Sequence, residues 1–314
     1  MAVKILLTST SFIDTPGAHQ TLLYSQNFEI DTLRGPITDV DLLPIIGNYD
    51  AIICGDDELT REVLEVGKRN KLKYISKYGV GLDRIDLKAA KDLGLPVTNC
   101  PGVNQVSVSE HAFALLLSFV KNIHLEYNIT REGGWKRHIS TEIFGKKIAI
   151  LGYGAIGGEM VKRAKAFGLN VAVYDKYANM DRLAGLDVEV ANSIEELVEN
   201  ADVITLHIPH TSETEGVIGF DLINNHLKKG AIIINTSRGK LVNLDALKEG
   251  LESGIVGGYL ADVLDIEPMP VNYPLKDWPN VLITPHISSR TFESVERQGL
   301  FAVNNLLKML KEEA

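Results

Sequence analysis

The chain has 314 residues, a formal net charge of −9 at pH 7 and a pI near 5.4. Hydrophobic residues make up 45% and charged residues 23%, an ordinary globular composition with enough apolar material for two domains. The acidic balance, without a cluster of Lys and Arg, excludes a nucleic-acid footprint, and no stretch reaches the ~18 apolar residues of a membrane span. The two cysteines match no disulfide framework and no zinc motif. We therefore expect a cytoplasmic protein with reduced thiols and no metal.

Short apolar runs alternate with helical patterns along almost the whole chain. Near-continuous apolar strands separated by helices are typical of parallel sheets covered on both faces, so the sequence predicts a doubly wound α/β architecture. The predicted strands are residues 3–7, 51–54, 72–76, 147–151, 171–174, 203–206, 231–235, 256–260 and 281–284.

Three helices stand out between these strands. Residues 106–122 are apolar nearly all round, which predicts burial either in a core or against another subunit. Residues 159–167 follow a glycine-rich turn. Residues 294–310 place apolar side chains at spacings of three, four and seven, which predicts an amphipathic helix.

Two proline-containing turns divide the chain into domains. Pro101-Gly102 precedes the first long helix, and Pro285-His286 precedes the last one. We predict one domain made of residues 1–102 plus 287–314 and a second domain, residues 103–286, inserted between its two parts.

A glycine-rich turn follows the predicted strand 147–151. It places Gly152, Gly154 and Gly157 in the pattern GxGxxG, just before a helix. The first glycine permits a tight turn, the second a close approach of a pyrophosphate, and the third close packing of the helix on the strand. The helix N-terminus adds free N–H groups and a positive dipole. The pattern therefore predicts dinucleotide binding, with a ligand-free glycine turn as the alternative.

An acidic residue ends the next predicted strand. Asp175 lies eighteen residues after Gly157 and is followed by Lys176, not by Arg. A carboxylate at this place accepts hydrogen bonds from both ribose hydroxyls of the adenosine half and repels a 2′-phosphate. Strand, turn, helix, strand and acid in this order argue against the ligand-free alternative and favour NAD over NADP.

Three polar residues follow later strands, where open α/β sheets bind their ligands. Arg238 follows strand 231–235, Glu267 lies in the segment after Asp262, and His286 follows strand 281–284. Reduction of a 2-keto acid needs a cation for the carboxylate and keto oxygen, which Arg provides with a planar fork of donors. It also needs a proton donor, which His provides, and a carboxylate beside the His would orient it.

Each of these residues alone has a simpler explanation. A single His at a strand end is more often structural than catalytic, an Arg can be a surface ion-pair partner, and a Glu before Pro can be a turn residue. The three together, downstream of a nucleotide motif, favour a hydride-transfer enzyme that acts on C2 of a small 2-hydroxy acid.

The chain resembles the D-isomer-specific 2-hydroxyacid dehydrogenases over essentially its whole length. The resemblance implies a Rossmann NAD-binding domain inserted into a flavodoxin-like substrate domain, and a homodimer joined through the NAD-binding domain. The matching stretches are residues 77–86, 104–111, 152–157 with Asp175, 236–239, 262–268 and 284–286.

The resemblance also implies roles for individual residues. Arg238, Glu267 and His286 become the catalytic trio. The substrate side takes the backbone N–H groups of Val80 and Gly81 as a cradle for the carboxylate, with Asn104 at the same cleft. Further cofactor contacts implied by position are Ala155, Ile156, Asp175, Ile208, Thr236 and Asp262.

Within this family the chain looks most like the short-form D-3-phosphoglycerate dehydrogenases of serine biosynthesis. A phosphorylated substrate needs extra cations, and Lys77 and Arg137 stand where that subfamily places basic residues, with ordinary surface charge as the alternative. We expect no regulatory domain after the final helix. One departure concerns Ser288 and Ser289, where the family commonly has glycines, because Ser resists the close backbone approach near the nicotinamide that Gly permits.

Five other functions are alternatives. A hydroxypyruvate or glyoxylate reductase, or a D-lactate-type dehydrogenase, would use the same trio on another 2-keto acid. A formate dehydrogenase shares the fold but has Gln in place of Glu267. A co-repressor-like NAD-binding protein would recruit peptides, and no extended tail or peptide groove is evident. A catalytically inactive NAD-binding subunit would lack one of the trio, and none is missing.

Overall fold

The computed structural model describes residues 2–177, 183 and 185–312. Contacts between Cα atoms divide the chain into two units, Met1–Asn104 with Ser289–Ala314, and Gln105–Ser288. Each junction lies two residues after the predicted one, at Asn104 instead of Gly102 and at Ser288 instead of His286. Among the described residues, no helix has the length and apolar character that crossing a membrane requires.

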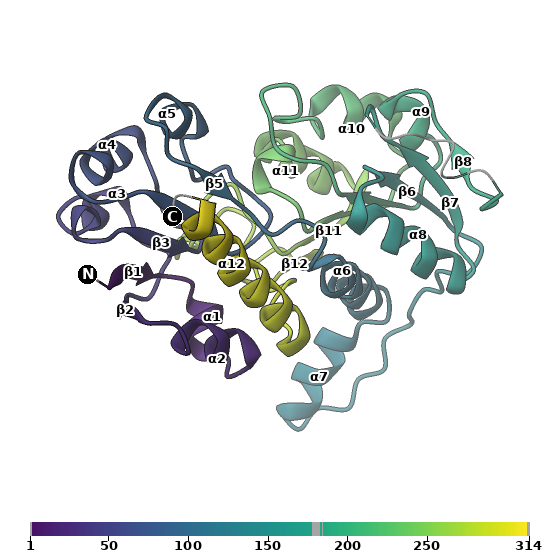
Figure 1. Cartoon of the computed structure of the whole chain (residues 1–314). Helices are drawn as coiled ribbons and strands as arrows, with labels where there is room; N and C mark the ends of the chain where they lie inside the picture. Colours follow the sequence, from purple (N-terminus) through teal and green to yellow (C-terminus); the bar gives the residue numbers. More distant parts are fainter. Residues whose placement is uncertain (1, 178–182, 184, 313–314) are drawn as a thin grey trace. The chain divides into compact units, whose positions relative to one another are not determined.

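The first unit is a five-stranded parallel sheet with helices on both faces (Figure 1). Its strand order is β2-β1-β3-β4-β5, the flavodoxin-like order in which the sheet grows in two directions from the first strand. The strands are β1 (Val3–Leu7), β2 (Phe28–Thr32), β3 (Ala51–Cys54), β4 (Tyr74–Lys77) and β5 (Val97–Thr98). The helices are α1 (Thr10–Asp14), α2 (Ala18–Tyr24), α3 (Asp39–Leu42), α4 (Arg61–Asn70), α5 (Leu87–Asp92) and α12 (Phe292–Glu312).

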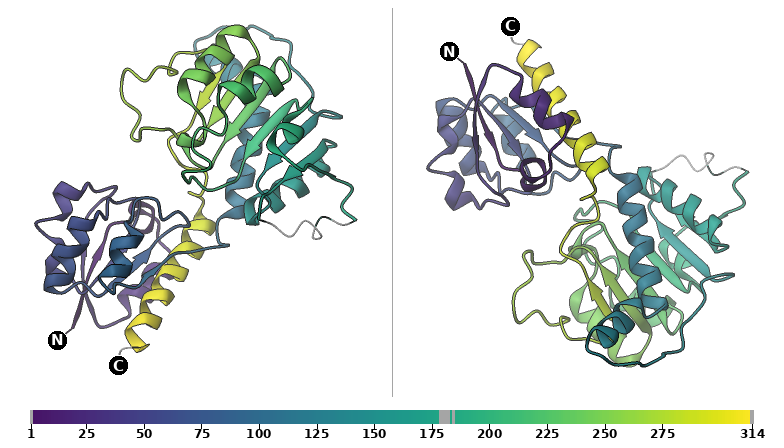
Figure 2. Two further views of the ribbon diagram at one scale, coloured as in Figure 1. Left: turned by 90° about the horizontal axis from the view of Figure 1, so that it is seen from above. Right: turned by 90° about the horizontal axis from the view of Figure 1, so that it is seen from below.

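The strands of this sheet are buried on both faces, as their near-continuous apolar sequence predicts. Successive residues point to opposite sides, so Ile52 packs with α3, α4 and α5, whereas Ile53 packs with α1, α2 and α12. Helix α12 belongs to this unit although it ends the chain, and Figure 2 shows it lying along the N-terminal sheet. Its predicted apolar stripe is confirmed: Val295, Ala302, Val303 and Leu306 lie in the core, with Leu307 and Leu310 packed against it.

The second unit is a seven-stranded parallel sheet in the order β12-β11-β10-β9-β6-β7-β8. This is the Rossmann order. Strands β7 and β8 are added on one side of β6, the first strand of the unit, and β9 to β12 are added on its other side. The strands are β6 (Lys147–Leu151), β7 (Asn170–Tyr174), β8 (Glu189–Val190), β9 (Val203–Leu206), β10 (Ala231–Asn235), β11 (Val256–Ala261) and β12 (Val281–Ile283). The helices are α6 (Gln105–Val120), α7 (Ile123–Arg131), α8 (Ala155–Ala166), α9 (Ile194–Val198), α10 (Phe220–His226) and α11 (Leu244–Ser253).

The apolar helix α6 is buried in the core of its own unit. Ala112, Phe113 and Leu116 pack with α8 against one face of the sheet, and α9, α10 and α11 cover the other face. Of the two predicted environments for this helix, the structure shows the core of the same chain.

The sequence did not predict three strands, β2, β5 and β8. All three lie at sheet edges, where one side lacks a neighbour and burial is incomplete. Strand β2 mixes Glu29 and Asp31 with apolar residues, and β5 and β8 have two residues each, so no continuous apolar run marks them. Strand β4 begins at Tyr74, two residues later than predicted.

A substitution in α12 tests whether the last helix holds the first unit together. Leu306 is fully buried, so Leu306→Ala removes apolar contacts and leaves a cavity in the core. We expect a loss of about 2 to 5 kcal/mol in the free energy of unfolding, measured by urea denaturation. Asn304→Ala, on the exposed side of the same helix, is the control and changes stability by less than about 0.5 kcal/mol. Equal stability of the two variants would contradict this packing.

Candidate active site

The proposed catalytic trio follows three neighbouring strands of the second unit. Arg238 comes after β10, Glu267 after β11 and His286 after β12, and these strands are adjacent in the sheet. Because all three strands run parallel, their carboxyl ends meet at one edge. The alternation of strand and helix therefore places a cation, a carboxylate and an imidazole at the same edge of one sheet.

Glu267 and His286 are in direct contact. The Nδ1 atom of His286 lies 2.8 Å from Oε2 of Glu267, and both side chains are about one-third exposed. The other carboxylate oxygen, Oε1, accepts a hydrogen bond of 2.8 Å from the backbone N–H of Leu264. Because Nδ1 faces the carboxylate, Nε2 is the ring nitrogen that would exchange a proton with a ligand.

A close backbone approach links the Arg238 turn to the segment of Glu267. A Cβ atom on Gly239 would lie 1.9 Å from the carbonyl carbon of Leu264 and 2.2 Å from the nitrogen of Asp265. Only glycine allows this distance. Leu264 is the same residue that donates to Glu267, so the segments that carry Arg238 and Glu267 touch through their backbones.

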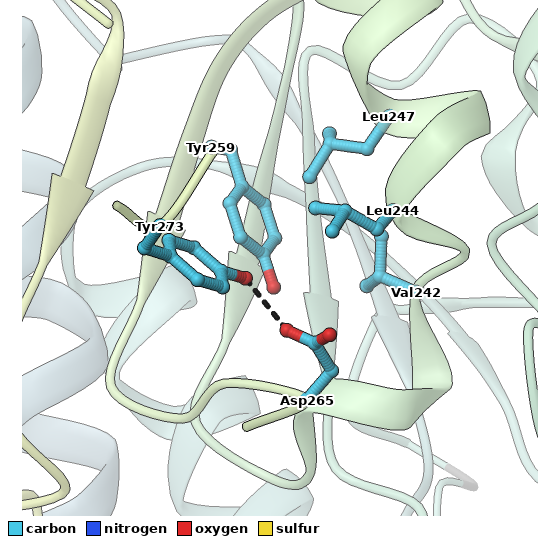
Figure 3. A pocket seen from close by; sticks show the side chains of 7 residues that line it. Val242, Leu244, Leu247, Tyr259, Asp265 and Tyr273 are labelled. Atoms are coloured by element: carbon cyan, nitrogen blue, oxygen red, sulfur yellow. Dashed lines mark hydrogen bonds between the residues drawn. The ribbon is translucent and has the colours of Figure 1, made fainter. Parts of the chain in front are cut away.

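Tyr273 stabilises the same segment, which contains Leu264 and Asp265. The hydroxyl of Tyr273 donates a hydrogen bond of 2.7 Å to the carboxylate of Asp265, and the ring of Tyr259 lies beside this pair (Figure 3). Burial raises the pKa of both tyrosines, so both hydroxyls stay protonated at neutral pH. These groups, with Val242, Leu244 and Leu247, line a cavity of about 10 Å³, which has room for one water and not for a substrate.

The buried carboxylate of Asp262 fixes the segment that carries His286. It accepts hydrogen bonds from the hydroxyl of Thr284 at 2.6 Å, from the N–H of Ile287 at 2.9 Å and from the N–H of Ser288 at 2.7 Å. Asp262 is 1% exposed. Asp262, directly after β11, thus holds residues 284–288, which follow β12, and the cofactor contact that the resemblance implies for it stays a prediction.

His286 has a left-handed backbone conformation with φ = 53°. Its N–H donates to the carbonyl oxygen of Asp262 at 2.8 Å, which stabilises a conformation that is uncommon outside glycine. Neither Ser288 nor Ser289 has a positive φ, so the backbone here does not require the glycines that the family commonly has. Ser288 instead uses its N–H to bind Asp262.

The glycine-rich turn has the geometry of a phosphate cradle. Gly152 has φ = 103°, and a Cβ atom on Gly157 would lie 2.0 Å from the carbonyl oxygen of Gly152. A Cβ atom on Gly154 would meet no atom within 4 Å, so the space beside it is open to a ligand. Helix α8 begins with Ala155 and Ile156 directly after this turn, and its free N–H groups lie at the same place.

Asp175 ties the end of β7 to this turn. Its carboxylate accepts hydrogen bonds from the N–H of Tyr153 at 2.7 Å and from the N–H of Tyr177 at 2.8 Å. A carboxylate oxygen can accept more than one hydrogen bond, so ribose hydroxyls can bind as well. The acid therefore stands beside the phosphate turn, as a dinucleotide site requires.

Two further cofactor candidates follow β9 and β10. Ile208 lies next to the turn, since its side chain is 2.9 Å from a Cβ atom built on Gly152. The Thr236 hydroxyl is buried and has no hydrogen-bond partner in the described part of the protein. A buried hydroxyl without a partner costs free energy, so a polar ligand at this strand end would satisfy it. The residues present thus fit a dinucleotide.

The neighbouring His207 was not predicted from the sequence. Burial lowers its pKa to about 3, so its ring is neutral at pH 7, and Nε2 lies 2.8 Å from the hydroxyl of Thr205. Another unpredicted residue is His111, whose Nε2 lies 2.9 Å from the Thr284 hydroxyl and 3.5 Å from Asp262. The only sequence signal for His111 is its place at the end of the stretch 104–111.

The residues expected at the substrate belong to both units. Lys77, Val80, Gly81 and Asn104 lie in the first unit and Arg137 in the second. The side chain of Arg137 is exposed. That of Lys77 is only 3% exposed and its ammonium group is 2.7 Å from Asp56, so the structure does not support Lys77 as a direct phosphate ligand.

Comparison with known proteins identifies the family. The model of the D-isomer specific 2-hydroxyacid dehydrogenase, NAD binding domain, matches residues 113–288. The chain belongs to the D-isomer-specific 2-hydroxyacid dehydrogenases. The second unit is the NAD-binding domain of this family, and the predicted Rossmann architecture is confirmed.

Individual members of this family are similar over most of the chain. A D-3-phosphoglycerate dehydrogenase of Methanocaldococcus jannaschii is 37% identical over 99% of the chain, which spans 58% of the length of that relative. A glyoxylate reductase of Korarchaeum cryptofilum is 33% identical over 92% of the chain and 88% of its own length. The crystal structure of NAD-dependent formate dehydrogenase from Staphylococcus aureus in complex with NAD has a TM-score of 0.85 at 30% identity, covering 99% of this chain and 97% of its own.

Two adjacent glycines test the phosphate turn. Gly157→Ala forces a Cβ atom against the carbonyl of Gly152, whereas Gly158→Ala meets only the Tyr153 ring, at 4.0 Å. We expect Gly157→Ala to weaken NADH binding at least about tenfold, measured by fluorescence titration, because the turn must open. Gly158→Ala is the matched control and keeps the affinity of the unmodified protein. Equal affinities of the two variants would argue against this turn as the dinucleotide site.

Proposed function

We propose that this protein is an NAD-dependent dehydrogenase that interconverts a small D-2-hydroxy acid and its 2-keto acid. The observation that supports this best is the contact of 2.8 Å between His286 and Glu267 at the sheet edge shared with Arg238. Family membership and the glycine-rich turn agree with it. NAD, when bound, supplies the hydride chemistry at C2.

The side chains of the trio divide the remaining work. Arg238 binds the carboxylate of the substrate and polarises the keto oxygen through its guanidinium N–H groups. Nε2 of His286 donates the proton that converts the keto oxygen into a hydroxyl and accepts it in the reverse direction. Glu267 holds the ring in position and stabilises the imidazolium form.

For the substrate, we propose 3-phosphohydroxypyruvate and D-3-phosphoglycerate, which would place the enzyme in serine biosynthesis. The similarity to a D-3-phosphoglycerate dehydrogenase supports this choice, and the exposed Arg137 is available for a phosphate. The glyoxylate reductase of comparable identity supports the alternative, a general 2-keto acid reductase.

We also propose a homodimer joined through the NAD-binding domain. Large apolar side chains remain exposed in the segment between α7 and β6: Trp135 is 84% exposed, Ile139 98% and Phe144 78%. On α7, Tyr127 is 59% exposed and Ile123 is 55% exposed. Contiguous exposed apolar residues mark association surfaces, and a second copy of this chain would bury them.

A substrate panel tests the proposed activity. NADH oxidation is followed with 3-phosphohydroxypyruvate, hydroxypyruvate, glyoxylate, pyruvate and 2-ketoisocaproate, and again with NADPH. We expect the highest kcat/KM with 3-phosphohydroxypyruvate and NADH. A preference for glyoxylate or hydroxypyruvate would select the general reductase, and no turnover with any of them would refute the dehydrogenase function.

Two substitutions test the proton-transfer pair. His286→Ala removes the proton donor and should lower kcat at least about 100-fold. Glu267→Gln keeps the size of the side chain but removes its charge, and a loss of about tenfold is expected. Glu249→Gln, an exposed glutamate on α11, is the control for a lost charge and keeps kcat. Near-normal kcat in His286→Ala would refute its role as the proton donor.

Asp175 tests the preference for NAD. Asp175→Ala removes the charge that repels a 2′-phosphate, so the ratio of kcat/KM for NADH to that for NADPH should fall at least about tenfold. Loosening of the glycine turn would weaken both cofactors alike and leave this ratio unchanged. Asp277→Ala, an exposed position of the same unit, should also leave it unchanged.

A further inference from the structure

The turn after β4 presents two consecutive backbone N–H groups without an acceptor. Within the described part of the chain, neither the N–H of Val80 nor that of Gly81 donates to a protein atom. Val80 is 40% exposed, so these groups lie near the surface of the first unit. Successive free N–H groups in a turn form a concave site for an anion.

The carbonyl groups of the two peptides that carry these N–H groups accept hydrogen bonds from residues 99 and 100. The oxygen of Gly79 accepts a hydrogen bond of 2.8 Å from the N–H of Cys100, and the oxygen of Val80 accepts one of 2.7 Å from the side-chain amide of Asn99. In a planar trans peptide, C=O and N–H point in opposite directions. The N–H groups of Val80 and Gly81 therefore point away from residues 99 and 100.

Asn99 is itself anchored to the last helix. Its carbonyl oxygen accepts a hydrogen bond of 3.0 Å from the side chain of Asn305 on α12. The support of the turn thus extends into the core of the unit.

A buried cation lies beside this turn. Nζ of Lys77 is 2.7 Å from the carbonyl oxygen of Gly55 and 2.7 Å from Asp56, and a Cβ atom on Gly79 would lie 3.4 Å from it. The lysine, which is the last residue of β4, thereby connects the end of β4 to the segment after β3. Burial alone would lower the pKa of Lys77, but Asp56, Cys54 and Asp57 outweigh it and the pKa is raised, so the amine is charged at neutral pH.

The lysine also offsets negative charge near the turn. Asp57 is 1% exposed and accepts hydrogen bonds from the N–H groups of Ile37 and Gly55 and from the hydroxyl of Thr8. Lys77 interacts with the charges of both Asp56 and Asp57 and offsets them, and this negative charge would otherwise disfavour an anion at the turn.

We infer that Lys77 and Asn99 are positioning residues of an anion cradle formed by the N–H groups of Val80 and Gly81. Asn99 orients the N–H groups through its hydrogen bond to the carbonyl oxygen of Val80. Lys77 fixes the segment through its contacts with Gly55 and Asp56, and its positive charge offsets the nearby carboxylates. The inference rests on the proposed function in one respect, that the anion is the carboxylate of a 2-keto acid. Lys77 thus acts on the carboxylate common to all 2-keto acids and not on a phosphate.

Two readouts separate this inference from the proposed function. The first is KM and kcat for the best 2-keto acid of the panel. The second is the Kd of oxalate, measured by titration calorimetry on the full chain, which detects carboxylate binding without turnover. Absence of turnover in the unmodified protein would refute the proposed function, whereas the oxalate Kd still tests the cradle.

We expect Lys77→Met and Asn99→Ala each to raise KM and the oxalate Kd at least about tenfold, with kcat changed less than about threefold. Lys77→Arg keeps the charge and should restore most of the affinity. Lys88→Met, which removes an exposed lysine of the same unit, is the control and changes neither constant. The NADH Kd should stay constant in all variants.

Several outcomes would overturn the inference. These are unchanged KM and oxalate Kd in Lys77→Met and Asn99→Ala, a Lys77→Arg variant as weak as Lys77→Met, or no oxalate binding to the unmodified protein. If Lys77→Met does not fold, Asn99→Ala carries the test alone, because it removes only the side-chain hydrogen bond to the carbonyl oxygen of Val80. The inference requires Asn99→Ala to raise the oxalate Kd at least about tenfold, and an unchanged Kd would contradict it.

Discussion

The carboxylate of Asp262 accepts three hydrogen bonds from the segment that follows β12. Asp262 directly follows β11, so this one buried group joins the ends of two neighbouring strands. The N–H of His286 binds the backbone oxygen of the same residue. Because the segment is fixed at both its backbone and its side chains, His286 keeps an uncommon backbone conformation and its ring meets Glu267. The proton-transfer geometry therefore depends on an acid that does not itself contact the ring.

Similar contacts position the other groups at the carboxyl ends of β10 and β11. Gly239 lets the Arg238 turn touch Leu264, Leu264 orients Glu267, and Tyr273 holds Asp265 next to it. Each functional side chain is positioned by a backbone group or a buried neighbour, which restricts its motion before any ligand arrives. Pre-organisation of this kind lowers the cost of ordering the site in the transition state. The turn after β4 in the first unit follows the same principle, with carbonyl groups held so that N–H groups face outward.

The sequence predicted the parts of the protein that repeat a regular pattern. Interior strands such as β6, β9 and β10 were predicted with their correct bounds, because burial on both faces leaves an unbroken apolar run. Three edge strands, β2, β5 and β8, were missed because they are very short or mix charged with apolar residues, which leaves no such run. The glycine motif and Asp175 were found because their spacing along the chain is fixed by one βαβ unit.

The contacts within the site were harder to predict, because they join residues far apart in sequence. Nothing near Lys77 in the sequence indicates that Asp56 neutralises it, since the two meet only when β3 and β4 pair. The clamp formed by Asp262 and the approach of Gly239 to Leu264 likewise depend on the order of strands in the sheet. The local sequence therefore identified the chemical groups, and the fold determined which of them touch.

The stereochemistry of the reaction tests the central claim most directly. The 2-hydroxy acid that corresponds to the best keto acid other than glyoxylate, whose product is achiral, is supplied as its separate D and L enantiomers with NAD, and NADH formation is followed. The account predicts turnover of one enantiomer alone, because one fixed imidazole and one fixed cofactor site define a single face of the keto carbon, and family membership makes this the D enantiomer. Comparable turnover of both enantiomers, or a preference for the L form, would contradict the assignment of this site to a D-2-hydroxyacid dehydrogenase.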